Sequence, residues 1–171
     1  MSSLVLSESA RKSWRRIVAL WSIMMAGILG QALILHFIMQ VPEIADTGLE
    51  DRTLLNVLRI SASALALLDI AVIFFSRKRL LARPVQASAG AGKRDEEALF
   101  TLALARYRLW IFLCAQLCEG MALAGFVLAF VERNVMAFIP FGILGMVLIW
   151  MYRPQEQEVE ELLRKWREGT S

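Results

Sequence analysis

The residues of this chain that could do chemistry are carboxylates and amides inside long apolar runs. Glu119 and Gln116 interrupt the run from Leu109 to Val131, and Asp69 interrupts an earlier run. A run of about twenty apolar residues matches the roughly 30 Å hydrocarbon core of a bilayer and is typical of a transmembrane helix. A carboxylate at that depth is costly, faces other helices or water, and marks a candidate functional site.

Helix geometry predicts the depth of these polar groups. With a rise of about 1.5 Å per residue, Asp69 and Gln116 are each expected about 10 Å from one edge of the membrane, and Glu119 near the midplane. Arg59 lies about 15 Å along the helix from Asp69 and roughly 80° around it, so we expect Arg59 to meet Glu119 or the membrane interface. The candidate polar partners beyond the midplane are Gln31, Arg59 and His36.

Three functions are open for these residues. They could be structural hydrogen bonds that fix helix register, each worth about 0.6 to 2 kcal/mol. Alternatively, Glu119, Asp69 and Gln116 could form a proton- or ion-binding site, because a proton relay needs carboxyls with an amide close by. An enzyme has the least support, because no nucleophile with a base, metal cluster or cofactor motif has a recognisable spacing.

The two cysteines favour packing over chemistry. Cys114 and Cys118 are four residues apart, so they share one face of a helix at bilayer depth. Neighbouring turns of a straight helix give poor disulfide geometry, and we expect reduced, buried thiols. The chain has a single histidine, His36, and no cluster of metal-ligand spacing, so we expect no metal site and no cofactor.

Composition predicts an all-α, multi-pass membrane protein. The chain has 171 residues, of which 57% are hydrophobic, and its charges are gathered in short blocks between long apolar ones. We expect four transmembrane helices in a bundle, followed by a C-terminal amphipathic helix in the cytoplasm. The predicted boundaries are a basic N-terminal segment at 1–16, a transmembrane domain at 17–152 with helices at 17–40, 54–76, 109–131 and 135–152, a cytoplasmic loop at 77–108, and a tail at 153–171.

Small residues and one apolar stripe indicate how helices pack. Gly27, Gly30 and Ala26 give the first helix a small face that another helix could approach closely. In the tail, four apolar residues fall at helical spacing on one stripe: Val159, Leu162, Leu163 and Trp166. That stripe could lie on the lipid interface, pack on the chain itself or dock on a partner.

Basic residues predict the orientation. They gather in the N-terminal segment, the central loop and the tail, whereas the loops on the other side hold only Arg52 and Arg133. Both termini are therefore expected in the cytoplasm of a bacterium, with the chain in the inner membrane. The central loop lacks interleaved aromatic residues and is flanked by glutamates, so we expect it to attract lipid headgroups and not nucleic acid.

The segment from Ala115 to Val131 resembles the carboxylate-bearing helix of the rotary ATPase proteolipid (c) subunits. The resemblance implies that Glu119 matches the ion-binding carboxylate and Gly125 the glycine after it. Two departures argue against a ring subunit: the Gly-rich partner helix is missing, and the carboxylate helix starts a hairpin instead of ending one. The segment through Tyr152 to Pro154 also resembles a family of uncharacterised small bacterial four-helix membrane proteins, which implies no activity.

These observations together predict an integral inner-membrane protein with no enzymatic activity. We expect it to act as an assembly or accessory component in the lipid bilayer, as a homo-oligomer or with a membrane-protein partner. The alternative is a proton- or ion-binding membrane subunit that uses Glu119, Asp69 and Gln116.

Overall fold

The computed structural model describes residues 8–41, 51–82 and 93–168, and every regular element in these ranges is helical. Parts of the predicted N-terminal segment, the central loop and the tail lie outside the described residues. The elements are α1 (Glu8–Ile38), α3 (Arg52–Leu80), α4 (Lys93–Glu132), the short 3-10 helix η2 (Val135–Ala137), α5 (Ile139–Met151) and α6 (Glu156–Glu168). The predicted all-α class is confirmed.

Three helices are long and apolar enough to cross a membrane, namely α1, α3 and α4. A fourth passes the same test only when the segment Val135–Met151 is counted together with α6, from which it is bent by 58°. The reason is length, because α5 has 13 residues and reaches only about 20 Å at 1.5 Å per residue.

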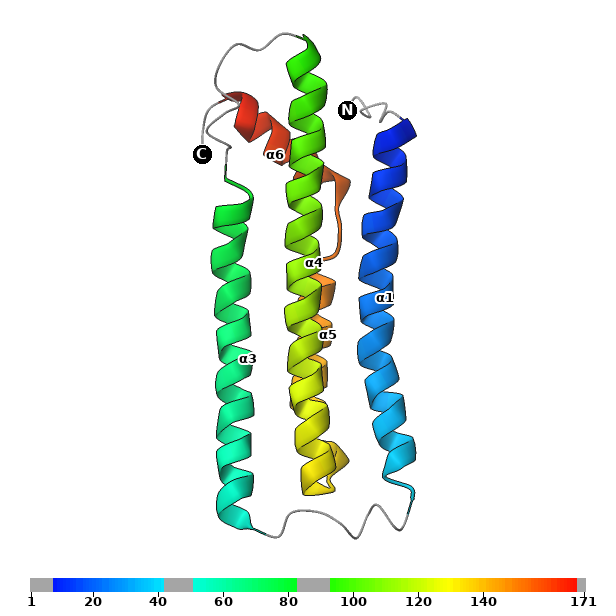
Figure 1. Ribbon diagram of the computed structural model, residues 1–171, viewed down its shortest axis with the longest axis vertical. Coiled ribbons are helices and arrows are strands. Elements are labelled where there is room, and N and C mark those ends of the chain that lie inside the picture. Colours follow the sequence, from blue (N-terminus) through cyan, green and yellow to red (C-terminus); the bar gives the residue numbers. More distant parts are fainter. Residues whose placement is uncertain (1–7, 42–50, 83–92, 169–171) are drawn as a thin grey trace.

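Helix α4 lies at the centre of the bundle (Figure 1), with α1 on one side, α3 on the other and α5 behind it. It is the longest helix, with 40 residues, and begins well before the predicted span. Tyr107, Trp110, Cys114 and Cys118 are all buried on the side of α4 that faces the other helices. The core of the molecule is therefore organised along one helix.

The outer helices bury one stripe each and expose apolar side chains elsewhere. In α1, Ile17, Met24, Ile28 and Leu35 are buried at spacings of seven and four, which place them on one face. In α3 the buried residues are Ala66, Asp69 and Ile73. Large apolar side chains cover the remaining faces, including Ile23, Leu33 and Phe37 on α1 and Ile60, Leu67 and Phe75 on α3. Such surfaces suit contact with lipid.

Glycines allow α4 and α5 to approach closely. A Cβ atom added at Gly145 of α5 would lie 2.7 Å from the backbone oxygen of Cys118 in α4, so the two backbones nearly touch. Gly125 of α4 likewise leaves room for the ring of Phe141. Of the small face predicted for α1, Gly27 lies against Glu119 of α4, whereas a Cβ at Gly30 would meet nothing within 4 Å.

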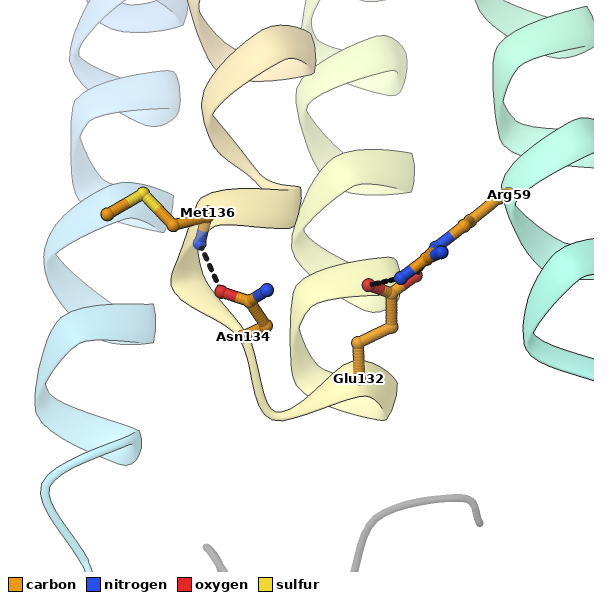
Figure 2. A network of polar contacts seen from close by, with 4 residues as sticks. All are labelled: Arg59, Glu132, Asn134 and Met136. Carbon is orange, nitrogen blue, oxygen red and sulfur yellow. Dashed lines mark hydrogen bonds and ion pairs between the residues drawn. The ribbon is translucent and has the colours of Figure 1, made fainter. Parts of the chain in front are cut away.

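A short turn joins α4 to η2 and α5 (Figure 2). Arg133 has a φ of 52°, the left-handed conformation that commonly ends a helix. The next residue, Asn134, caps η2, because its side-chain oxygen accepts a 3.0 Å hydrogen bond from the backbone N–H of Met136. The turn sends α5 back along α4.

Helix α6 packs on the chain's own helices. Val159, Leu162, Leu163 and Trp166 are all buried and join the main core. The indole N–H of Trp166 donates a 3.2 Å hydrogen bond to the backbone oxygen of Leu81, just past the end of α3. The sequence left open whether this stripe meets the lipid interface, the chain itself or a partner. In the structure it packs on the chain itself, against α3 and α4.

Polar contacts also hold α6 in place. Arg77 of α3 forms a 3.0 Å ion pair with Glu158. The hydroxyl of Tyr107 in α4 donates to the same carboxylate at 2.9 Å and accepts a 3.1 Å hydrogen bond from the backbone N–H of Gln155. Glu158 is therefore joined to both α3 and α4.

We predict that Gly145→Ala destabilises the bundle, because the added methyl group would press on the backbone of Cys118. Overpacking of this kind costs about 1–3 kcal/mol. Thermal unfolding in detergent, followed by circular dichroism, measures the effect. Gly30→Ala is the matched control, because it brings the same gain in helix propensity into open space. Equal stability of the two variants would contradict the close approach.

Candidate functional site

One side of the central helix is uncovered. Its residues follow one another at intervals of three or four, and we call them the open face of α4: Leu109, Phe112, Gln116, Gly120, Leu123 and Val127. Leu109, Leu123 and Val127 are each about half exposed, at 53%, 51% and 50%. A Cβ at Gly120 would meet nothing within 4 Å. The described helices thus leave room beside the middle of α4.

A shallow groove borders the first part of this face. It has a volume of about 430 Å³ and runs between α1 and α4, with Leu20, Ala105, Arg108, Leu109 and Phe112 as its lining. Apart from the guanidinium of Arg108, the lining is apolar. The groove is therefore a surface for apolar groups, with one positive charge at its edge.

Glu119 stands beside the open face, on the side of α1. Its carboxylate points at Gly27, where an added Cβ would lie 2.8 Å from Oε1, so the missing side chain makes room for it. Glu119 is partly buried, and no hydrogen bond or ion pair links it to any residue that the structure describes. A carboxylate in an apolar segment is thus left without a partner within the described ranges.

The two glutamines near this position are also poorly satisfied. The side-chain amide of Gln116 approaches only the sulfur of Met24, at 3.5 Å, and a thioether is a weak acceptor. On α1, the side-chain oxygen of Gln31 is buried and has no hydrogen-bond partner. Polar groups on α1 and α4 at this level therefore keep unused hydrogen-bonding capacity.

Asp69 occupies a different interface. It is 8% exposed and lies where α3 packs on α4, close enough to Cys118 for an electrostatic interaction. Glu119, the next residue along α4, points about 100° away from Cys118. Among the described residues, no hydrogen bond or ion pair joins Asp69, Gln116 and Glu119, so the structure does not bring the three predicted site residues into one contact.

Arg59 pairs with Glu132 and not with Glu119. Its guanidinium forms a two-pronged ion pair with Glu132, with Nε 2.5 Å from Oε1 and Nη2 2.7 Å from Oε2 (Figure 2). The side chain of Arg59 is 55% exposed and that of Glu132 only 4%. This pair forms because α3 and α4 run in opposite directions and bring the start of one level with the end of the other. The alternative expectation, that Arg59 meets the membrane interface, stays a prediction.

The other residues considered in the sequence analysis are His36 and the two cysteines. The ring Nε2 of His36 lies 3.0 Å from the side-chain amide of Gln40, just past the end of α1, and no hydrogen bond or ion pair among the described residues joins His36 to Glu119 or Asp69. Cys114 and Cys118 are buried and form no disulfide. Within the described ranges, no three His, Cys, Asp or Glu residues are gathered as a metal site would need.

Sequence reasoning did not single out Glu132 or Glu158, which pair with Arg59 and Arg77. Both glutamates stand at helix ends, where charged residues look solvated. The antiparallel order of α3 and α4 could have indicated these pairs. A basic residue near one end of α3 lies level with the opposite end of its neighbour in the chain, so an acidic residue there is a candidate partner.

Comparisons of this chain with models of protein families, with curated proteins and with solved structures find no match. The two family resemblances therefore stay predictions.

The ion pair of Arg59, near the start of α3, with Glu132 predicts that removing one charge destabilises the protein more than removing the other. Arg59→Gln should lower the unfolding temperature more than Glu132→Gln, because it leaves a buried carboxylate unpaired. The double variant should recover part of the loss. Thermal unfolding of the three variants in detergent measures this. Strictly additive effects would mean that the two side chains do not stabilise each other.

Proposed function

We propose that this chain is a multi-pass protein of the bacterial inner membrane and a non-enzymatic assembly or accessory component, which binds a transmembrane helix of a partner protein on the open face of α4. Helices α1, α3 and α4 cross the bilayer, and the segment Val135–Met151 is the fourth span. Both termini and the amphipathic helix α6 lie in the cytoplasm.

Aromatic residues support this topology. The five tryptophans lie at the end of the bundle where the basic residues gather: Trp14, Trp21, Trp110, Trp150 and Trp166. Tryptophan is enriched at membrane interfaces, and Lys and Arg are enriched in cytoplasmic loops. The indole N–H of Trp21 donates a 2.8 Å hydrogen bond to the backbone oxygen of Ile149, near the end of α5. We take this level as the cytoplasmic edge of the membrane.

The observation that carries the proposal is Glu119, which borders the open face on the side of α1 and has no partner among the described residues, together with Gly120 on the open face itself. Lipid tails offer a carboxylate no hydrogen-bond donor, whereas a partner helix can. Small residues let helices approach closely, and Gly120 leaves that space. A partner helix with a basic or hydroxyl side chain at the depth of Glu119 would satisfy both features.

Charge favours a different protein over a second copy of this chain. In a two-fold symmetric dimer through the open face, each Glu119 would lie near the other, and Gln116 would face Gln116. Two carboxylates close together in an apolar layer repel each other. A partner that supplies a donor avoids this repulsion.

We predict that a photo-crosslinking amino acid at Leu123, on the open face, captures a partner protein in native membranes. Leu67, 68% exposed on the outer side of α3, is the matched position that should capture only lipid. Mass spectrometry should map the crosslink to a transmembrane segment with a hydrogen-bond donor.

Variants of Glu119 and Gly120 make this experiment specific. Capture at Leu123 should survive Glu119→Gln, which keeps an acceptor oxygen, and fall sharply with Glu119→Leu or Gly120→Leu. Crosslinks to a second copy of this chain would establish a homo-oligomer instead. Equal capture at Leu67 and Leu123 would contradict a docking face.

The second candidate is a proton- or ion-binding subunit that uses Glu119, with Gln116 and Asp69 as neighbours. It is favoured by one observation, namely that no described residue engages the Glu119 carboxyl, which leaves it free to exchange a proton. Here Glu119→Gln would abolish activity, whereas the assembly role tolerates this change.

Carbodiimide labelling of native membranes, read by mass spectrometry at Glu119 and Asp69, separates the two candidates, because the reagent attacks protonated carboxyls in apolar surroundings. For the assembly role we predict no labelling of Glu119 between about pH 6 and 9, because the partner helix covers this carboxyl and its donor occupies it. Labelling that falls as the pH rises through this range would support the proton-binding role.

A further inference from the structure

A second groove lies where the end of α3 meets α6. It has a volume of about 490 Å³, and its lining includes Arg77, Lys78, Leu81 and Ala82 on the side of α3 and Glu161 and Lys165 on α6. The Arg77–Glu158 ion pair and the hydrogen bond from Trp166 to Leu81 join its two sides. Specific contacts between α3 and α6, two elements far apart in sequence, therefore hold the two sides of the groove together.

Two lysine side chains of this groove, those of Lys78 and Lys165, have no acidic partner among the described residues. Arg77 is engaged by Glu158, which also accepts from Tyr107. Lys78 on α3 and Lys165 on α6 make no hydrogen bond or ion pair with another residue in the described part of the chain. Glu161 is likewise without an ion pair in the described part of the chain. Two ammonium groups against one carboxylate leave the groove with a net positive charge, which attracts an anion.

The rest of the lining is apolar. Leu81 is partly buried and Ala82 is exposed, so both offer hydrocarbon surface beside the two lysines, whereas Leu162 and Trp166 are buried. A soluble anion would gain nothing from this surface, whereas a molecule with both a phosphate and hydrocarbon would use the cations and the apolar wall together. Basic pockets between helices on the cytoplasmic side of membrane proteins bind anionic lipid headgroups for this reason.

We propose that this groove binds the headgroup of an anionic phospholipid, with its phosphate between Lys78 and Lys165 and its glycerol and first acyl carbons against Leu81 and Ala82. Glu161 is an acceptor for a hydroxyl group, so the groove fits phosphatidylglycerol. The inference rests on the proposed membrane topology, which puts the groove at the cytoplasmic headgroup layer, and not on the partner helix.

Reconstitution of the full chain into nanodiscs tests this site. The discs contain phosphatidylcholine with or without phosphatidylglycerol, and native mass spectrometry of the released protein counts the lipids that stay bound. We expect the wild type to retain phosphatidylglycerol preferentially, and the double variant Lys78→Gln, Lys165→Gln to lower that preference about thirtyfold, since each of the two basic residues contributes about 1 kcal/mol.

The matched control removes two charges at the same end of the bundle but outside the groove, with Lys12→Gln and Arg79→Gln. It should keep the preference. An equal loss in both double variants would reduce the effect to general surface attraction and overturn the site. Stabilisation of the detergent-solubilised wild type by inorganic phosphate, without lipid, would make it a soluble-anion site and also contradict the proposal.

Two further measurements separate loss of lipid binding from misfolding and from failure of the proposed membrane topology. Thermal unfolding in pure phosphatidylcholine discs shows whether the groove variant folds like the wild type, so that a lost preference reports binding. A chain that does not enter nanodiscs at all would contradict the membrane topology. A chain that enters and shows no preference would contradict the lipid site alone, and leave capture at Leu123 unaffected.

Discussion

The packing of the other helices against α4 is the constraint on which the rest of this structure depends. Helices α1 and α3 flank α4 on opposite sides and α5 lies behind it (Figure 1), so one helix carries nearly all of the shared core. This arrangement needs the glycines that let α5 reach the backbone of α4. It also leaves one side of α4 bare, and the candidate site stands on that side because no described helix covers it.

Helix α3 shows how a sparsely packed element is kept in place. It buries only Ala66, Asp69 and Ile73, yet an ion pair joins it to its neighbours near each end. Arg59 pairs with Glu132 of α4, and Arg77 pairs with Glu158 of α6. The two pairs fix the position of α3 along the bundle, where apolar contact alone would allow it to slide. In this bundle, therefore, charged residues at the helix ends set the register.

Apolar runs were enough to predict the all-helical class and the helices that carry Asp69 and Glu119, because a long run of Leu, Ile, Val and Phe has few other uses. The neighbours of each polar residue could not be predicted in the same way. In a lipid-facing helix the apolar side chains lie all round, so periodicity does not reveal which face meets another helix. Hence Glu132 was not predicted as the partner of Arg59, and Asp69 and Glu119, which were grouped as one candidate site, lie on different sides of α4. The stripe of α6 was easier to detect, since its opposite face is charged.

The position of Glu158 has a consequence for how the chain is made. During synthesis α3 is complete long before α6, so Arg77 has no partner in α6 when α3 is first made, and Arg59 waits in the same way for Glu132. Under the membrane topology proposed above, α3 would cross the bilayer in that interval with Asp69, Arg59 and Arg77 not yet covered by α4 and α6. We therefore expect the nascent chain to need shelter for these charges until α4 and α6 are complete.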